Sequence, residues 1–245
     1  MTTHEILHGD CLELLPSIEG KSVNLIYLDP PFFTQKTHRL TNRDGDQTFS
    51  FDDVWRSFSE YGDFIHKRLQ LLHRLLAADG SLFFHCDRNA AHIVRILLDN
   101  VLGVELFRAE IIWHYRSWSN SKKGLLPAHQ IIYHYSISMN FKCNRIYTDY
   151  SSSTNVDLIL LKRERNSANK TIYAKNGDGN VISNGGKQGV PLSDVWDIPY
   201  LNPKAKERTG YPTQKPLLLL ERILQLTTDE GDLVLDPFCG SGTTI

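Results

Sequence analysis

The sequence has few cysteines, and no two of them are close together. Its four cysteines, Cys11, Cys86, Cys143 and Cys239, are spread over 245 residues. Zinc clusters and disulfide frameworks need clustered cysteines, so we expect neither, and we expect a reducing, cytoplasmic location. The ten histidines are scattered as well, and we find no metal-ligand spacing among them.

Long hydrophobic runs are also missing. No run of 18 apolar residues exists, so we do not expect a membrane-spanning helix. The first ten residues lack a basic segment followed by an apolar one, so we expect no secretory signal. With 41% hydrophobic and 22% charged residues, the composition is ordinary for a soluble protein. The length fits one α/β domain with an inserted lobe.

The net charge of −1 hides an uneven distribution. Residues 116–210 hold 14 Lys and Arg against 7 Asp and Glu, a net charge of +7, whereas the remainder holds 13 against 21, a net charge of −8. A basic middle between acidic ends is typical of an insert that contacts nucleic acid. A set of loops that are merely rich in lysine and arginine is the alternative.

Apolar patterns predict alternating strands and helices, which favours a doubly wound α/β sheet. The middle of the chain, residues 140–210, is polar and predicts a loop-rich insert. The expected strands are 22–29, 81–87, 110–115, 131–137 and 232–236, and the expected helices are 62–77, ended by residues 77–80, then 90–102 and 215–227.

The first motif that indicates chemistry is Asp29-Pro30-Pro31-Phe32, directly after an apolar strand. Ligands of α/β sheets bind at the carboxyl ends of the strands, where this carboxylate is expected. Asp29 and the Pro30 carbonyl are acceptors, and Phe32 is a stacking face, so the turn suits a planar group that carries an NH2. A plain strand-ending Pro-Pro turn is the alternative.

The second motif is DPFCGSGTT, from Asp236 to Thr244, after another expected strand. Gly240 and Gly242 allow backbone N–H groups to approach a ligand closely. The spacing matches neither the phosphate-binding GxxxxGK[ST] loop nor GxGxxG.

Together these segments resemble the S-adenosylmethionine-dependent DNA amino-methyltransferases. LDPPF comes first, TGYPTQKP precedes DPFCGSGTT, and this order resembles the β class of that family. GDC, GSLFFHCDR and HQIIYHYS look like further family segments, so the resemblance spans the whole chain. It implies a mostly parallel Rossmann-like sheet, with a catalytic half over 1–115, a target-recognition region over 116–210 and the start of a cofactor-binding half over 211–245.

The resemblance also implies roles for individual residues. The catalytic positions are Asp29, Pro30, Pro31 and Phe32, where Asp29 and the Pro30 carbonyl hold the target amine and Phe32 stacks on an extruded base. Cys239 is expected to be structural, because direct methyl transfer needs no covalent enzyme intermediate. The implied S-adenosylmethionine contacts are Asp10, Cys11, Asp29, Thr213, Gln214, Lys215, Asp236, Pro237, Phe238, Gly240, Ser241, Gly242 and Thr243.

Two of these cofactor contacts have simpler alternatives. Lys215 is expected to pair with the cofactor's carboxylate, and a solvated lysine at a helix start is the alternative. Asp10 and Cys11 match a turn that contacts the cofactor's adenine, and an N-cap for a helix at 11–15 is the alternative for Asp10.

Double-stranded DNA is the partner that the resemblance implies, with a cognate restriction endonuclease as a possible second one. The target base must leave the duplex to reach such a pocket. The side chains of the basic insert can contact phosphates and base edges, although a solvated charged face is the alternative for any single one. The candidates are Arg116, Lys122, Lys123, Lys162 and Arg163.

The target base and the end of the chain leave further alternatives. Asp in the first position of DPPF favours adenine N6, with cytosine N4 as the alternative. Another alternative function is that of a catalytically dead DNA-binding fragment. A third is methylation of RNA or of a protein glutamine. The chain ends at Ile245, just after GSGTT, so we expect the C-terminal part of the core to be missing. The hypothesis that follows is weak cofactor binding, which calorimetry would test.

Overall fold

A computed structural model describes residues 3–41, 48–116, 123–150, 160–184, 189–202, 205–211 and 213–244. It divides into two compact units, one of residues 1–144 and 193–245 and the other of residues 145–192. In the described part of the chain no helix is both long enough and apolar enough to cross a membrane.

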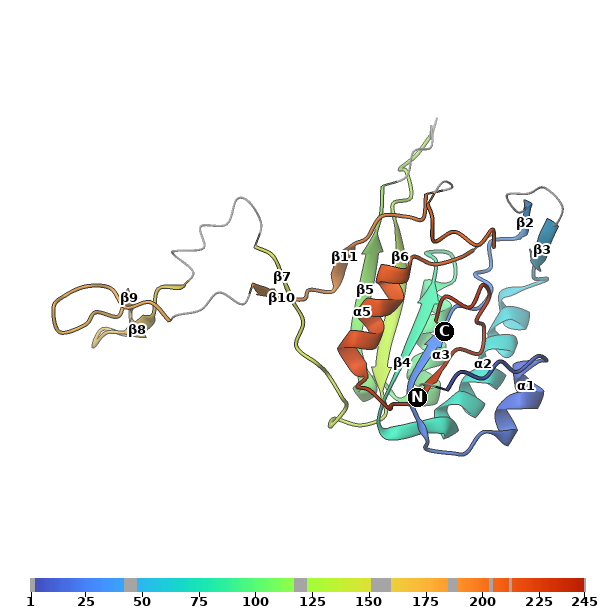
Figure 1. Cartoon of the computed structure of the whole chain (residues 1–245), viewed down its shortest axis with the longest axis horizontal. Helices are drawn as coiled ribbons and strands as arrows, with labels where there is room; N and C mark the ends of the chain where they lie inside the picture. Colours follow the sequence, from blue (N-terminus) through green and yellow to red (C-terminus); the bar gives the residue numbers. More distant parts are fainter. Residues whose placement is uncertain are drawn as a thin grey trace. The chain divides into compact units, whose positions relative to one another are not determined.

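The larger unit is built on a six-stranded sheet (Figure 1). β1 pairs in parallel with β4 and β12, and β11 pairs in parallel with β5, whereas β6 runs antiparallel to both β4 and β5. The order across the sheet is β11 (Val195–Asp197), β5 (Phe107–His114), β6 (His129–Ser136), β4 (Leu76–Cys86), β1 (Val23–Leu28) and β12 (Val234–Leu235). The expected doubly wound, mostly parallel α/β fold is therefore confirmed.

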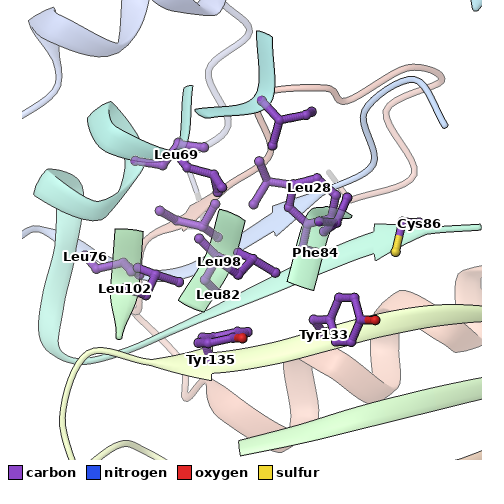
Figure 2. Packing of buried hydrophobic residues seen from close by; sticks show 14 of the residues in the cluster. Leu28, Leu69, Leu76, Leu82, Phe84, Cys86, Leu98, Leu102, Tyr133 and Tyr135 are labelled. Carbon is purple, nitrogen blue, oxygen red and sulfur yellow. The ribbon is translucent and has the colours of Figure 1, made fainter. Parts of the chain in front are cut away.

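Helices lie on both faces of this sheet (Figure 1). α2 (Phe58–Leu75) and α3 (Ala91–Leu102) pack on one face, and α5 (Leu217–Thr227) lies on the other. Figure 2 shows Leu69 of α2 and Leu98 of α3 gathered against Leu82 and Phe84 of β4. Side chains alternate between the faces of a strand, so each buried strand can serve two helical layers.

Short elements complete the larger unit. α1 (Cys11–Leu14) and the 3-10 turn η1 (Leu15–Ser17) precede β1, and the 3-10 turn η2 (Val104–Leu106) precedes β5. β2 (Lys36–Thr41) and β3 (Thr48–Asp53) form an antiparallel hairpin directly after the Asp29 motif, which the sequence patterns did not predict.

The described residues of the second unit include two short antiparallel strand pairs. β7 (Tyr147–Thr148) pairs with β10 (Val190–Pro191), and β8 (Arg163–Arg165) pairs with β9 (Thr171–Tyr173). The prediction of a loop-rich insert over residues 140–210 is wrong for the C-terminal part of that range, because β11 belongs to the main sheet. Trp196 of β11 is buried, and Trp113 Nε1 of β5 donates to the carbonyl of Ile198, just beyond β11, at 2.8 Å.

The predicted bounds also differ around α2. The helix was expected over 62–77 but begins at Phe58, because Ser57 caps it by accepting from the Glu60 backbone N–H at 3.1 Å. Ser57 and Glu60 have the S-x-x-E spacing of an N-terminal capping box, a signal that the periodicity argument missed. The following residues do not end the helix in a glycine cap. Leu76 already pairs with Val23, so β4 begins five residues earlier than the expected Ser81.

The buried layer on α3 supports the sheet and gives a stability prediction. Leu98→Ala is expected to lower the free energy of unfolding by about 2–5 kcal/mol, because Leu98 is fully buried and the change leaves a cavity. Leu125→Ala, at a position that is 94% exposed, is the control and should change it by less than about 0.5 kcal/mol. Urea unfolding followed by circular dichroism measures both, and equal effects would contradict the packing in Figure 2.

Candidate active site

The two sequence motifs meet at the carboxyl ends of β1 and β12. These strands pair in parallel, with Leu25 opposite Val234 and Ile26 opposite Leu235, so Asp29 and Asp236 both emerge at the same edge. A cavity of about 500 Å³ opens there. Its lining includes the predicted residues Asp29, Pro30, Pro31, Phe32, Thr213, Gln214, Lys215, Asp236, Phe238, Gly240, Ser241 and Thr243.

The Asp29 carboxylate has one occupied oxygen and one open oxygen. Lys215 Nζ donates to Oδ2. Oδ1 is buried and accepts no hydrogen bond from the described residues, and His85 Nδ1 lies 3.7 Å from it. Burial raises the pKa of Asp29, and the charge and hydrogen bond of Lys215 oppose that rise without cancelling it. Asp29 therefore keeps an acceptor that its own protein surroundings do not use.

His85 of β4 explains why Oδ1 stays open. Its Nδ1 lies 2.8 Å from Tyr27 Oη and its Nε2 lies 2.7 Å from Gln130 Oε1. Burial, followed by the charge of Lys215, holds the pKa of His85 well below its ordinary value, so the ring is neutral. With the single ring proton on Nε2 and donated to Gln130, Nδ1 accepts from Tyr27 and has no hydrogen to donate to Asp29.

The Phe32 ring lies close to both His85 and Lys215. Its centroid is 5.4 Å from that of His85, and Lys215 Nζ is 5.1 Å from it, within cation–π range. The ring lines the cavity and is only partly buried, so it offers an apolar face to a planar ligand.

The glycine-rich loop is held by Asp236. Its carboxylate accepts from the Phe238 backbone N–H at 3.0 Å and from Thr244 Oγ1 at 2.5 Å. Burial raises the pKa of Asp236 to about 6, against the lowering effect of these hydrogen bonds. Gly240 and Gly242 have φ of 53° and 76°, and a Cβ on Gly240 would lie 3.1 Å from the Tyr211 ring. Side chains would therefore strain this loop and crowd the space beside it.

Lys215 and Gln214 lie at the start of α5. Lys215 is 7% exposed, so a solvated lysine is excluded. Its Nζ donates to Asp29 and, at 3.1 Å, to the Thr213 carbonyl. Gln214 is bound within the chain, accepting from Thr209 N–H at 2.8 Å and donating to the Glu207 carbonyl at 2.7 Å. The predicted contact of Lys215 with a cofactor carboxylate stays a prediction.

Four predicted cofactor residues are placed outside this lining. Pro237 and Gly242 belong to the glycine-rich loop but do not line the cavity. Asp10 caps α1 through Leu12 N–H at 2.9 Å and pairs with Arg68 at 3.0 Å, so its N-cap role is confirmed. The Leu12 hydrogen bond is the main reason that the pKa of Asp10 is lowered. Cys11 packs against the core, and a cofactor contact by Asp10 or Cys11 remains a prediction.

The predicted DNA-contacting residues lie in different parts of the chain. Arg116 and Lys123 are exposed between β5 and β6, in the larger unit, so the compact second unit is narrower than the expected region 116–210. Lys162 and Arg163 are exposed in the second unit, where the Arg163 guanidinium lies 5.7 Å from the Tyr173 ring. Lys122 lies outside the described residues.

The cavity also contains residues that motif reasoning missed. Tyr27 and Gln130 hold His85, and Asp53 at the end of β3 binds the loop after Phe32. Tyr27 lies in the predicted strand 22–29, and Gln130 lies in β6, one residue before the predicted strand 131–137. Both face the side of the sheet opposite α2 and α3, because their neighbours Ile26, Leu28 and Ile131 pack with those helices. The available signal was the polar hydroxyl of Tyr27 within an apolar strand. Tyr211, Cys239 and Thr244 belong to the recognised motifs but were not assigned a cofactor or catalytic contact. The lining residues outside the motifs are Tyr27, Thr34, His38, Phe51, Asp53, Asp87, Gln130, Tyr200 and Leu220.

Known proteins resemble this chain in sequence and in fold. Residues 23–245 match the model of the DNA methylase family of N6 and N4 methyltransferases. The chain belongs to this family. It is 30% identical over 242 residues to the DNA adenine methyltransferase YhdJ of Escherichia coli (strain K12), covering 98% of the chain and 72% of YhdJ.

Solved structures show the same fold. The cytosine-N4-specific PvuII DNA methyltransferase has a TM-score of 0.60 at 18% identity, covering 96% of this chain and 74% of that one. An M1.HpyAVI–SAM complex has a TM-score of 0.53 at 17% identity, covering 97% and 83%. The chain spans from 50% to 78% of the length of six curated relatives that it matches.

The Asp29–Lys215 pair gives a prediction about protonation. Lys215→Met is expected to raise the pKa of Asp29 further, by about one unit or more, because it removes the cation that favours the carboxylate. A pH titration of the 13C-labelled Asp29 carboxyl by NMR measures this. Lys67→Met, at an exposed position of α2, is the matched control. An unchanged midpoint in Lys215→Met would show that the ion pair does not control Asp29.

Asp236 gives a prediction about stability and pH. Its folded pKa of about 6 is above the ordinary value of 3.8, so its contribution to stability is full below about pH 4 and is lost as the pH rises through about 6. Asp236→Asn removes this titration. The stability of the unaltered protein relative to Asp236→Asn should therefore fall between pH 4 and pH 6.5 in urea unfolding. A relative stability that rises over this interval would contradict the raised pKa.

Proposed function

We propose that this protein is a site-specific DNA methyltransferase that moves a methyl group from S-adenosylmethionine to the exocyclic N6 of adenine in an extruded base. The observation that carries the proposal is the open, buried Oδ1 of Asp29 beside a cavity that the glycine-rich loop also lines. A base-holding acceptor and a cofactor-type loop at one cavity suit transfer between the two.

The residues present fit the cofactor. A Cβ at Gly240 would lie 3.1 Å from the Tyr211 ring. Because glycine has no side chain, the backbone at this position can approach a ligand. Lys215 supplies a cation suited to a ligand carboxylate. When bound, S-adenosylmethionine would supply an electrophilic methyl group on a sulfonium. The loop residues Phe238, Gly240, Ser241 and Thr243 would hold it, as would the segment Thr213–Lys215.

The chain's own groups would act on the target amine. Asp29 Oδ1 and the Pro30 carbonyl would accept its two hydrogens, which draws the nitrogen lone pair out of conjugation and stabilises the positive charge that develops on it. Phe32 would stack on the base. The neutral His85 adds no competing donor, and Asp29 need not be a strong base because the proton can leave after the transfer. Positioning of the amine would supply much of the rate.

The proposed DNA contact has a separate basis in charge. Residues 116–210 carry the basic surplus, and Arg116, Lys123, Lys162 and Arg163 are exposed. Arginine and lysine contact phosphates, so these side chains would orient a duplex. The target-recognition role of this region is part of the proposal, and a cognate restriction endonuclease is a possible partner.

Adenine is preferred to cytosine as the target. Asp29 occupies the first position of the DPPF motif, and YhdJ, named as a DNA adenine methyltransferase, is a relative at 30% identity. Cytosine N4 is the second candidate, since its amino group also lies beside a ring nitrogen and would meet the same acceptors. The similarity to the cytosine-specific PvuII enzyme, at 18% identity, supports only the common fold.

The test is methyl transfer from labelled S-adenosylmethionine to unmethylated genomic DNA, followed by nucleoside mass spectrometry. N6-methyladenine is the expected product, and N4-methylcytosine would move the function to the second candidate. DNA binding without methyl transfer would contradict the enzyme assignment and favour a DNA-binding fragment.

Asp29→Asn is expected to lower kcat by about 100-fold or more, because it replaces a charged acceptor where positive charge develops. Asp63→Asn, on the exposed face of α2, is the matched control and should keep the activity of the unaltered protein. Steady-state kinetics of both variants on one DNA substrate measure the difference. If Asp29→Asn kept the kcat of the unaltered protein, Asp29 would have no role in the reaction.

A further inference from the structure

The loop that follows the Pro-Pro turn is held by one buried carboxylate. Asp53, at the end of β3, is 1% exposed and accepts five hydrogen bonds from described residues. Three come from the successive backbone N–H groups of Phe32 (3.2 Å), Phe33 (2.9 Å) and Thr34 (2.7 Å). The others come from Thr34 Oγ1 at 2.6 Å and Trp55 Nε1 at 2.9 Å.

The backbone that Asp53 binds is strained. Phe33 and Gln35 have φ of 63° and 56°, in the left-handed region that non-glycine residues rarely adopt. Such residues persist only where their surroundings hold them. Gln35 adds a second restraint, because its side chain donates to the Trp55 carbonyl and accepts from the Trp55 N–H, both at 2.7 Å.

This strained loop begins at Phe32, whose ring is the stacking face of the site. Upstream, Pro30 and Pro31 have fixed φ and no N–H, so they cannot tie the loop to its neighbours by donating hydrogen bonds. The first N–H groups after the prolines are those that Asp53 accepts. The direction of the Phe32 ring therefore depends on a residue that is 21 positions away in the sequence.

We propose that Asp53 is a positioning residue, which holds the backbone of residues 32–34 so that the Phe32 ring is preset to stack on an extruded base. The role in stacking rests on the proposed function. Asp53 touches neither the base nor the cofactor in this role and acts through the loop. The hairpin of β2 and β3 is then the element that carries Asp53 to the catalytic turn.

The first test needs no substrate. In Asp53→Asn an NH2 group replaces one of the two carboxylate oxygens. An NH2 group cannot accept from the backbone N–H groups, so the hydrogen bonds to that oxygen are lost. Hydrogen exchange of the ligand-free protein, followed by NMR, should show the N–H groups of Phe32, Phe33 and Thr34 exchanging at least about tenfold faster, while those of β1 are unchanged. Asp52→Asn is the matched control, since Asp52 is the preceding, exposed residue and binds Thr37 Oγ1 at 2.6 Å.

The second test is kinetic. A loosened Phe32 should lower kcat for DNA methylation by about 10- to 100-fold, since small misplacements of reacting groups are costly. The dissociation constant of S-adenosylmethionine, by calorimetry, should stay within about twofold, because the glycine-rich loop is untouched. Asp52→Asn should match the unaltered protein in both.

Several outcomes would overturn the proposal. Unchanged exchange of residues 32–34 would show that Asp53 does not hold the loop, and faster exchange with unchanged kcat would show that the loop's order does not matter. If Asp53→Asn also exposes β1, Thr34→Val decides. It removes the hydroxyl that donates to Asp53, together with the 2.9 Å contact of that hydroxyl with His38 Nε2, and it keeps the three backbone donors. It should give smaller shifts in the same direction, and no shift would count against the proposal. Absence of methylation by the unaltered protein would contradict the proposed function, while the exchange result would still judge the Asp53 contact.

Discussion

The site depends on the buried pair of Asp29 and Lys215. Removing two charges from water is costly, and losing one partner leaves the other uncompensated. The pair joins the end of β1 to the start of α5, 186 residues apart in the sequence. It keeps a carboxylate at the sheet edge and occupies only one of its oxygens, so the same contact that makes burial tolerable leaves Oδ1 available.

The described lining of the cavity contains more acidic than basic side chains. Among the described residues, four carboxylates line it, Asp29, Asp53, Asp87 and Asp236, against one lysine, Lys215. Asp53 accepts hydrogen bonds from five donors. Burial is the largest cause of the raised pKa values of Asp29, Asp87 and Asp236. An excess of negative charge in a partly closed site favours a ligand that brings positive charge. The sulfonium of the proposed cofactor has that property.

The sequence predicts those parts of the fold that depend on local pattern. β1 and α3 lie within a residue of their expected bounds, because an apolar run and a helical spacing are properties of one segment. β11 and the β2–β3 hairpin were missed. Val195–Asp197 is three residues long and becomes a strand only because β5 lies beside it.

The sequence also predicts some parts of the site and not others. The Asp29 and Asp236 motifs could be recognised because each is contiguous, and they do line one cavity. The link of Asp29 to Lys215 and the network of Tyr27, His85 and Gln130 could not, because those partners come from different strands and from α5. Asp10 shows the local case again: its N-cap was foreseeable from the residue type, and its Arg68 partner on α2 was not.

The pairing of β1 with β12 explains why the two halves of the site can lie at opposite ends of the chain. Two residue pairs, Leu25 with Val234 and Ile26 with Leu235, are enough to bring Asp29 and Asp236 to one edge. The order of the motifs along the sequence then has no bearing on the geometry that they form. The unit at 145–192 is inserted between β6 and β11, strands that do not carry Asp29 or Asp236. A region placed there can change its sequence, and with it the surface it presents, without altering the pair of strands that defines the reacting groups.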